Sequence, residues 1–102
     1  MTRSAPVLVS ILVPVFNEEE NVARAYDAVR DVFGGLPGYE FELIFTDNHS
    51  TDATFTLLRE IATHDPRVRV IRFARNYGYQ RSLLVGYQLC FEFFRFCNVS
   101  NS

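Results

Sequence analysis

Hydrophobic residues along this chain recur at two spacings, one typical of strands and one typical of helices. Residues 7–13 form an almost wholly apolar, β-branched run that ends at Pro14, which predicts a strand buried on both faces. From Glu18 to Phe33, apolar residues instead recur every three or four positions, which predicts one face of a helix. Three glutamates, residues 18–20, fall in the expected first turn, where the helix dipole favours negative charge.

The same change of spacing continues further along the chain. Residues 41–46 and 68–73 predict two more strands, and residues 53–63 predict a helix for which Ser50-Thr51 offers an N-cap. A third helix is expected to begin at Gln80. The order β-α-β-α-β-α predicts an α/β fold with a Rossmann-like, three-layer parallel sheet and right-handed crossovers.

These elements divide the chain into a polar leader (residues 1–6), one α/β unit (residues 7–90) and a tail (residues 91–102). The tail places four phenylalanines within six residues, a pattern that does not fit a single helix face. We therefore interpret the tail as foreign to the fold, the product of a frameshift or of a premature end.

Composition narrows the classes of function. The 102 residues carry a net charge of -2 and a sequence pI of about 5.6, which excludes the basic footprint of a nucleic-acid-binding protein. Cys90 and Cys97 are too far apart on one continuous helix for a disulfide, and free thiols suit a reducing compartment. No signal-peptide layout and no membrane-spanning apolar run occurs in the sequence. We therefore expect a cytoplasmic chain without a transmembrane segment.

Polar residues gather where each predicted strand ends, at residues 16–20, 46–52 and 74–78. Ligands of open parallel sheets bind at this carboxyl edge. The chain contains neither Gly-x-Gly-x-x-Gly nor Gly-x-x-x-x-Gly-Lys, the patterns whose backbone N–H groups cradle phosphates. Three glutamates in the first cluster would also repel a phosphate. Redox cofactors and P-loop chemistry are therefore not expected.

The carboxylates at this edge suit a base or a ribose, since they accept hydrogen bonds. Glu18 and the Asp47-Asn48 pair come from neighbouring strands, and Phe16 could pack beside a planar base. The alternative for Glu18 is capping of a helix start, and Asp47 and Asn48 could be turn formers. Asp52 is interpreted as part of the second helix start.

Three linked motifs resemble those of family 2 glycosyltransferases. Ile11-Leu-Val-Pro-Val-Phe-Asn-Glu18 has the form Val-Pro-x-Tyr/Phe-Asn-Glu, and Phe45-Thr-Asp-Asn-His-Ser-Thr-Asp-Ala-Thr54 is similar to Asp-Asp-Gly-Ser-x-Asp-x-Thr. Arg75-Asn-Tyr-Gly-Tyr-Gln-Arg-Ser-Leu-Leu-Val-Gly86 is similar to an Arg-x-Asn-x-Gly segment of the polyprenyl-phosphate branch, which includes dolichyl-phosphate mannosyltransferases and bactoprenol glucosyltransferases. The resemblance covers residues 8–90 and implies the N-terminal, nucleotide-binding half of a GT-A fold.

The resemblance also implies the site residues. By it, the nucleoside would contact Pro14, Phe16, Glu18, Thr46, Asp47 and Asn48, and the sugar-nucleotide would lie near Arg75 and Gly78. Arg75 could pair with a phosphate, against the alternative of a surface charge. The implied donor is a UDP- or GDP-sugar, and one implied acceptor is polyprenyl phosphate at the cytoplasmic face of a membrane. Asn48 and His49 replace the second acid and the glycine of the motif, so the choice between uridine and guanosine stays open.

The sequence departs from the family in its metal site. Full-length relatives are expected to hold Mg²⁺ or Mn²⁺ through an Asp-x-Asp, and no Asp-x-Asp occurs in these 102 residues. We therefore expect little or no transferase activity from this chain alone. Two alternatives to a glycosyltransferase fragment remain open, a non-catalytic nucleotide-binding or interaction module and a non-functional truncated product.

Overall fold

The computed structural model describes residues 6–78, in which strands and helices alternate as the sequence predicts. The elements in chain order are β1 (Val7–Val15), α1 (Val22–Gly34), β2 (Tyr39–Asp47), α2 (Thr54–His64) and β3 (Val68–Arg72). The expected third helix, both cysteines and the tail lie outside the described residues, as does most of the leader. The β-α-β-α-β part of the prediction is confirmed.

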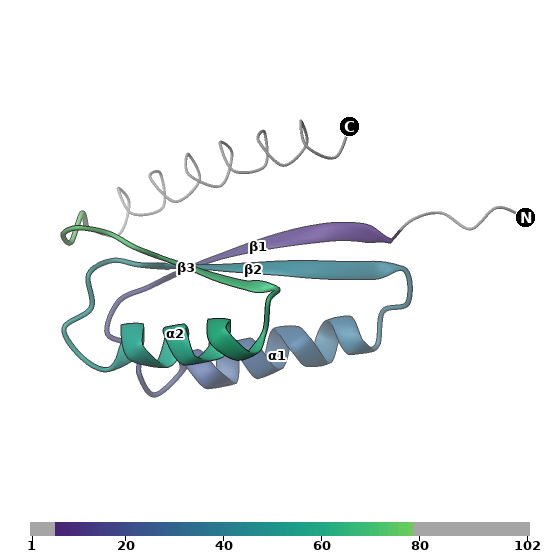
Figure 1. Cartoon of the computed structure of the whole chain (residues 1–102), viewed down its shortest axis with the longest axis horizontal. Coiled ribbons are helices and arrows are strands. Elements are labelled where there is room, and N and C mark those ends of the chain that lie inside the picture. Colours follow the sequence, from purple (N-terminus) through teal and green to yellow (C-terminus); the bar gives the residue numbers. More distant parts are fainter. Residues whose placement is uncertain (1–5, 79–102) are drawn as a thin grey trace, which may run out of the picture.

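The three strands form one parallel sheet in the order β1-β2-β3. Val13 pairs with Phe45 and Phe45 with Val70, so the strands run in register and their carboxyl ends meet at one edge. Both helices lie on the same face of this sheet (Figure 1). The fold is therefore α/β and Rossmann-like, as expected.

The hydrophobic core lies between β2 and the two helices. Phe41, Leu43 and Phe45, at alternate positions of β2, are almost completely buried, because side chains two apart in a strand face the same side. Leu58 of α2 and Val22 of α1 complete the buried cluster. Apolar residues at the three-and-four spacing of the two helices pack against it: Tyr26, Val29 and Phe33 of α1, and Ile61 and Ala62 of α2.

β1 differs from its prediction in two ways. The strand does not stop at Pro14 but continues through it to Val15. Val15 O accepts a hydrogen bond from Asn48 N, so alternate residues of β1 face β2 and the nitrogen of Pro14 points away from that partner. Val7 and Leu8 are more than half exposed, so burial on both faces was wrong for the beginning of the strand.

Both helices begin later than the periodicity predicts. α1 begins at Val22, and the three glutamates expected in its first turn lie in the loop before it. α2 begins at Thr54, with Ala53 at the N-cap, so the expected cap by Ser50 or Thr51 was wrong. Hydrogen bonds to the neighbouring loop, described below, draw these residues out of the helices.

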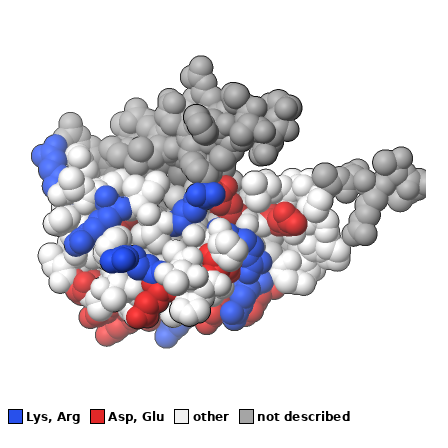
Figure 2. Space-filling model, viewed as in Figure 1, with Lys and Arg blue, Asp and Glu red and all other residues white. Residues whose placement is uncertain are grey.

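The arginines of β3, and Arg67 directly before it, form ion pairs rather than a continuous basic surface. Their nearest carboxylate contacts are Arg67 Nη2–Asp65 Oδ2 at 2.8 Å, Arg69 Nε–Glu42 Oε1 at 2.7 Å and Arg72 Nε–Asp47 Oδ2 at 3.6 Å. Phe55 of α2 is partly buried and lies under the guanidinium groups of Arg72 and Arg59. Figure 2 shows basic and acidic side chains mixed across the visible face.

Candidate functional site

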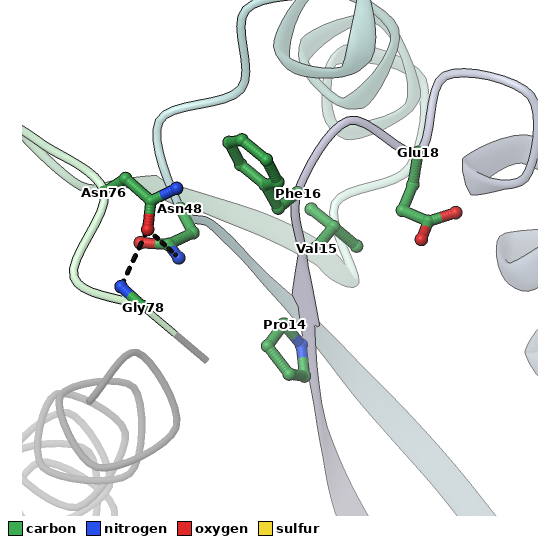
Figure 3. A pocket seen from close by; sticks show the side chains of 7 residues that line it. All are labelled: Pro14, Val15, Phe16, Glu18, Asn48, Asn76 and Gly78. Atoms are coloured by element: carbon green, nitrogen blue, oxygen red, sulfur yellow. Dashed lines mark hydrogen bonds between the residues drawn. The ribbon is translucent and has the colours of Figure 1, made fainter. Parts of the chain in front are cut away.

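A cavity of about 320 Å³ lies at the carboxyl edge of the sheet, where β1 and β2 end and the loop after β3 begins. It is lined by Pro14, Val15, Phe16, Glu18, Asn48, Asn76 and Gly78 (Figure 3). Parallel strands bring their carboxyl ends to one edge, and this edge is where ligands of open α/β sheets bind. The structure thus brings together Pro14, Phe16, Glu18, Asn48 and Gly78 from three separate segments predicted to form a site.

Thr46 and Asp47 are buried behind this cavity and do not line it. Asp47 Oδ1 accepts hydrogen bonds from Ser50 N at 3.0 Å and Ser50 Oγ at 2.5 Å, which closes the turn after β2. Its other oxygen lies 3.6 Å from Arg72 Nε. Asp47 therefore has the turn-forming role that was the alternative to a ligand contact, and its contact with a nucleoside stays a prediction.

Arg75 is exposed and lies outside the residues that line the cavity. Its guanidinium carbon is 4.7 Å from the centre of the Tyr77 ring. That ring in turn contacts Phe73 edge-on, at 5.6 Å between ring centres. The stacking holds the Arg75 side chain against Tyr77 of the same loop, and its pairing with a phosphate stays a prediction.

The loops after β1 and β2 interlock through hydrogen bonds between the two sequence motifs. Asn17 N donates to Ser50 Oγ at 2.9 Å, and Asn17 Oδ1 accepts from Thr51 N at 2.9 Å. Glu18 N donates to the buried Thr54 Oγ1 at 2.8 Å. Asn17 has a φ of 51°, a left-handed conformation that Asn tolerates better than most residues. The two motifs are therefore one structural unit, and sequence reasoning missed the roles of Asn17, Ser50 and Thr54 because the partners are more than 30 positions apart.

The neighbouring glutamates of the first loop have different roles. Glu18 lines the cavity, and its Oε2 accepts a hydrogen bond from Asn21 Nδ2 at 2.8 Å. Glu19 Oε2 instead accepts from Ala53 N at 3.1 Å, at the beginning of α2. Side-chain capping of a helix start was the alternative role for Glu18, but α1 has no side-chain cap, and it is Glu19 that accepts a hydrogen bond at the beginning of a helix, α2.

The start of α2 also holds Asp52 in its charged form. Partial desolvation raises the pKa of the Asp52 carboxyl, but hydrogen bonds from the Thr54 hydroxyl and N–H outweigh it, so the net pKa lies below its usual value. Asp52 Oδ2 lies 3.4 Å from Glu19 N. The interpretation of Asp52 as part of the helix start is confirmed.

Asn48 joins the β2 loop to the loop after β3. Its Oδ1 accepts from Tyr77 N at 2.9 Å, and its Nδ2 donates to Asn76 Oδ1 at 2.8 Å. Asn76 Oδ1 also accepts from Gly78 N at 2.7 Å. Asn76 was not singled out as a site residue in the sequence, although it lies in the Arg-x-Asn-x-Gly segment. Its position two residues before a glycine is the signal that could have identified it, since Asn side chains often accept from the backbone two residues on.

His49 occupies a backbone conformation that normally favours glycine. Its φ is 62°, in the left-handed region, which glycine adopts freely and other residues seldom do, although Asn, Asp and His occur there more often than the rest. Its Nδ1 lies 3.1 Å from Phe73 O, a contact that ties the β2 loop to the end of β3. This geometry explains why the similar motif has glycine here, and shows how a histidine can replace it.

Residues 10–92 match the family model described as glycosyl transferase family 2. The chain belongs to glycosyl transferase family 2. The resemblance stated from the three motifs is therefore confirmed.

The curated relatives of this family 2 chain are much longer than it is. A prophage bactoprenol glucosyl transferase homolog of Escherichia coli K12 is 41% identical over 78 residues, which are 76% of this chain and 25% of the relative. The bactoprenol glucosyl transferase of Shigella phage SfX gives the same figures. An uncharacterised glycosyltransferase of Bacillus subtilis, YkcC, is 38% identical over 77 residues, 76% of this chain and 24% of the relative. The chain thus spans about a quarter of the length of these relatives.

A solved structure with a similar fold is also longer than this chain. The structure of a mannosyltransferase from Pyrobaculum calidifontis, in complex with GDP-Man and Mn²⁺, matches with a TM-score of 0.66 over 83% of this chain and 24% of that one. The two are 20% identical, so this likeness concerns the fold. It supports the assignment of the described sheet to a GT-A glycosyltransferase.

The described residues do not fit the divalent metal of such an enzyme. Within residues 6–78 there is no group of three or more His, Cys, Asp or Glu side chains that could hold a metal ion. Carboxylate oxygens are the ligands that Mg²⁺ and Mn²⁺ prefer. Among the described residues Glu18 is the one carboxylate that lines the cavity, and there it acts as a hydrogen-bond acceptor. In the same part of the chain, no helix is long and apolar enough to cross a membrane.

Proposed function

We propose that the cavity at the carboxyl edge binds the nucleotide part of a nucleoside-diphosphate sugar. The observation that carries the proposal is the cavity itself, which a family 2 chain builds from three loops at the ligand-binding edge of its sheet. Within residues 6–78 its lining combines one aromatic ring, one carboxylate and two amides, a mixture that suits a planar base and a ribose. The GDP-Man bound to the mannosyltransferase of similar fold supports this class of ligand.

Phe16 is the proposed stacking partner of the base. Its side chain is 42% exposed at the cavity, although a phenylalanine is usually buried when the fold allows it. In Figure 3 the ring rises from the end of β1 between Glu18 on one side and the two asparagines on the other. A base stacked on this ring would cover apolar surface that is now open to water, a contribution of roughly 1–3 kcal/mol per base.

Glu18 is the proposed hydrogen-bond acceptor for the ribose or the base. One oxygen is held by Asn21, which fixes the direction of the carboxylate, and the other has no partner within residues 6–78. Gly78, at the other end of the cavity, has a φ of 79° and nothing within 4 Å of the position a Cβ would take. We expect this open space to admit part of the ligand.

For the longer proteins to which this chain is related, we propose transfer of a hexose from a UDP- or GDP-sugar to polyprenyl phosphate at the cytoplasmic face of a membrane. The names of the bactoprenol glucosyl transferases support the acceptor, and the Mn²⁺ of the mannosyltransferase supports a divalent ion in the whole enzyme. Because the chain spans about a quarter of the relatives, acceptor and metal sites are assigned to no residue of it.

The test is a calorimetric titration of the 102-residue chain with UDP, GDP, UDP-glucose and GDP-mannose. We expect saturable binding of at least one nucleotide, weakened roughly 5- to 150-fold by Phe16→Ala through the loss of stacking. Glu18→Gln should weaken binding as well, whereas the control Glu20→Gln, in the same loop but outside the cavity lining, should not. Absence of saturable binding of all four ligands, or equal affinity of Phe16→Ala and the unmodified chain, would refute the proposal.

A further inference from the structure

We infer that Asn76 is a positioning and specificity-determining residue. Together with Asn48 it supplies hydrogen-bond donors along one wall of the cavity. These donors select bases that carry a keto group. The inference rests on the proposed nucleotide site and concerns how that site chooses its base. It is argued from the orientation of two facing amides, which Figure 3 shows side by side at the end of the cavity away from Glu18.

The backbone fixes which atom of each amide is the oxygen. Gly78 N–H points at the Asn76 side chain from 2.7 Å, and only an oxygen can accept there. Tyr77 N–H likewise points at Asn48 from 2.9 Å, so that atom of Asn48 must also be oxygen. Asn48 Nδ2 then donates to Asn76 Oδ1 at 2.8 Å, so every donor in this network faces an acceptor. Turning either amide over would place donors against donors, so one orientation is favoured.

This orientation decides what remains for a ligand. Asn76 Oδ1 is already occupied by two donors, whereas its Nδ2 group makes no hydrogen bond within residues 6–78. Asn48 uses one N–H on Asn76 and keeps the second. Both residues line the cavity, and Asn48 is almost completely buried, so its amide cannot rotate freely into water. The wall formed by Asn48 and Asn76 therefore offers N–H donors.

The far side of the cavity has the opposite character, because a carboxylate such as that of Glu18 accepts hydrogen bonds and donates none. A ligand that fits both sides needs an acceptor at one end and donors at the other. A base with a keto oxygen at the pyrimidine 4-position, or at the equivalent purine 6-position, meets the donor wall with that oxygen, and the hydroxyls of its ribose, on the other side of the base, can face Glu18. Cytosine and adenine carry an amino group at that position, which would place donor against donor.

The variant Asn76→Asp separates the two roles of Asn76, which are to hold the two loops together and to donate a hydrogen bond to the base. An aspartate keeps an oxygen for Asn48 Nδ2 and Gly78 N, and so retains the link between the loops, but it replaces the Nδ2 donor by an acceptor. Its added negative charge should weaken all nucleotides alike, because it acts on the shared diphosphate. Asn76→Ala removes both functions, and the control Thr63→Ala, an exposed position on α2 outside the cavity lining, removes neither.

The experiment measures affinities of the 102-residue chain and these variants for two matched pairs, UDP against CDP and IDP against ADP. Within each pair the bases differ only in the keto or amino group and the adjoining ring nitrogen. We expect the chain and Thr63→Ala to prefer the keto member of the pair that binds by roughly 5- to 100-fold, the range expected when a donor is left facing a donor. Asn76→Asp should lose or reverse that preference while its thermal unfolding stays cooperative.

The outcomes separate this inference from the proposed function. If nucleotides bind but keto and amino members bind equally, the donor wall does not select the base and the inference is wrong. The same conclusion follows if Asn76→Asp folds and keeps the full preference, or if Asn76→Ala alters only stability. If no nucleotide of either pair binds, the proposed site itself fails, and the inference fails with it.

Discussion

The Asp65 carboxylate joins three elements at the end of the sheet opposite the cavity. It is 6% exposed and lies between α2 and β3. Tyr26 Oη of α1 donates to its Oδ2 at 2.6 Å, and Arg67 donates to both oxygens, from Nε at 2.9 Å and Nη2 at 2.8 Å. Arg67 also lies over the ring of Phe41 in β2, 4.2 Å from its centre. We expect Asp65→Ala to destabilise the fold strongly, because the change breaks all of these contacts to the carboxylate at once.

The magnitude follows from the burial of each partner. Removing one member of a fully buried ion pair costs about 3–5 kcal/mol. The Arg67 side chain is 47% exposed, so water screens its share of the interaction, and we lower the estimate to about 2–4 kcal/mol. Small domains unfold with a free energy of roughly 5–15 kcal/mol, so this loss is a large fraction of the total.

The pH dependence of stability should change as well. Hydrogen bonds from Arg67 hold the pKa of the Asp65 carboxyl well below its usual range. A carboxyl whose pKa is lower in the folded state stabilises the fold above its unfolded pKa of about 3.9, and this contribution is lost as the pH falls below that value. The hydrogen bond to Asp65 raises the pKa of Tyr26, so the contribution of Tyr26 is complete below about pH 10 and is lost above it. In Asp65→Ala, both the acid and the alkaline loss of stability should become shallower.

The assay is urea unfolding followed by far-UV circular dichroism, at pH 7 and at several values between pH 3 and 11. Asp31→Ala is the matched control, because Asp31 is 77% exposed and lies 4.0 Å from its ion-pair partner Arg30. Exposed substitutions of this kind change stability by about 0.5 kcal/mol or less. A free energy of unfolding for Asp65→Ala within about 0.5 kcal/mol of the control would refute the reasoning. If Asp65→Ala loses as much stability as the unmodified chain when the pH falls below about 4, the proposed effect of the Asp65 pKa on stability would be refuted.

Three further predictions concern the interlocked loops and the core, all measured by urea unfolding. Asn17→Ala should cost about 2 kcal/mol and Asn17→Gly less, because both lose the Thr51 contact but glycine tolerates the positive φ; equal losses would contradict this. Thr54→Val should cost about 1–3 kcal/mol and speed amide exchange at Glu18, whereas Thr54→Ser should be near neutral. Leu58→Ala should cost about 2–5 kcal/mol, against about 0.5 kcal/mol for exposed Val32→Ala, and a comparable loss at both positions would argue against the assigned core.

The order of elements could be predicted because it depends on local spacing. The apolar run before Pro14 and the three-and-four spacing after Glu18 each indicate one element without knowledge of any partner. The element boundaries depend on distant partners and were less accurate. Pro14 stays within β1 because the neighbouring strand lies on the side away from its nitrogen, and α1 begins late because Glu18 N is bonded to Thr54, 36 positions away.

The position of the site could also be predicted, because parallel strands bring polar loop residues to a common edge. Phe16, Glu18 and Asn48 were identified in this way and do line the cavity. The direction of each side chain could not be predicted from the same pattern. Asp47 follows β2 immediately but turns inward to Ser50, whereas Asn76, which no pattern singled out, faces the cavity.

The sequence by itself therefore determined the fold class, the family and the edge at which a ligand would bind, because these follow from periodicity and from motifs of adjacent residues. Only the tertiary structure decided which of the neighbouring polar residues bonds to another loop and which faces the cavity. Glu18 and Glu19, and likewise Asp47 and Asn48, are adjacent in sequence but face different partners, because each loop must satisfy the backbone groups of another loop. Which residue remains available for a ligand is set by those long-range hydrogen bonds, and a linear pattern does not contain them.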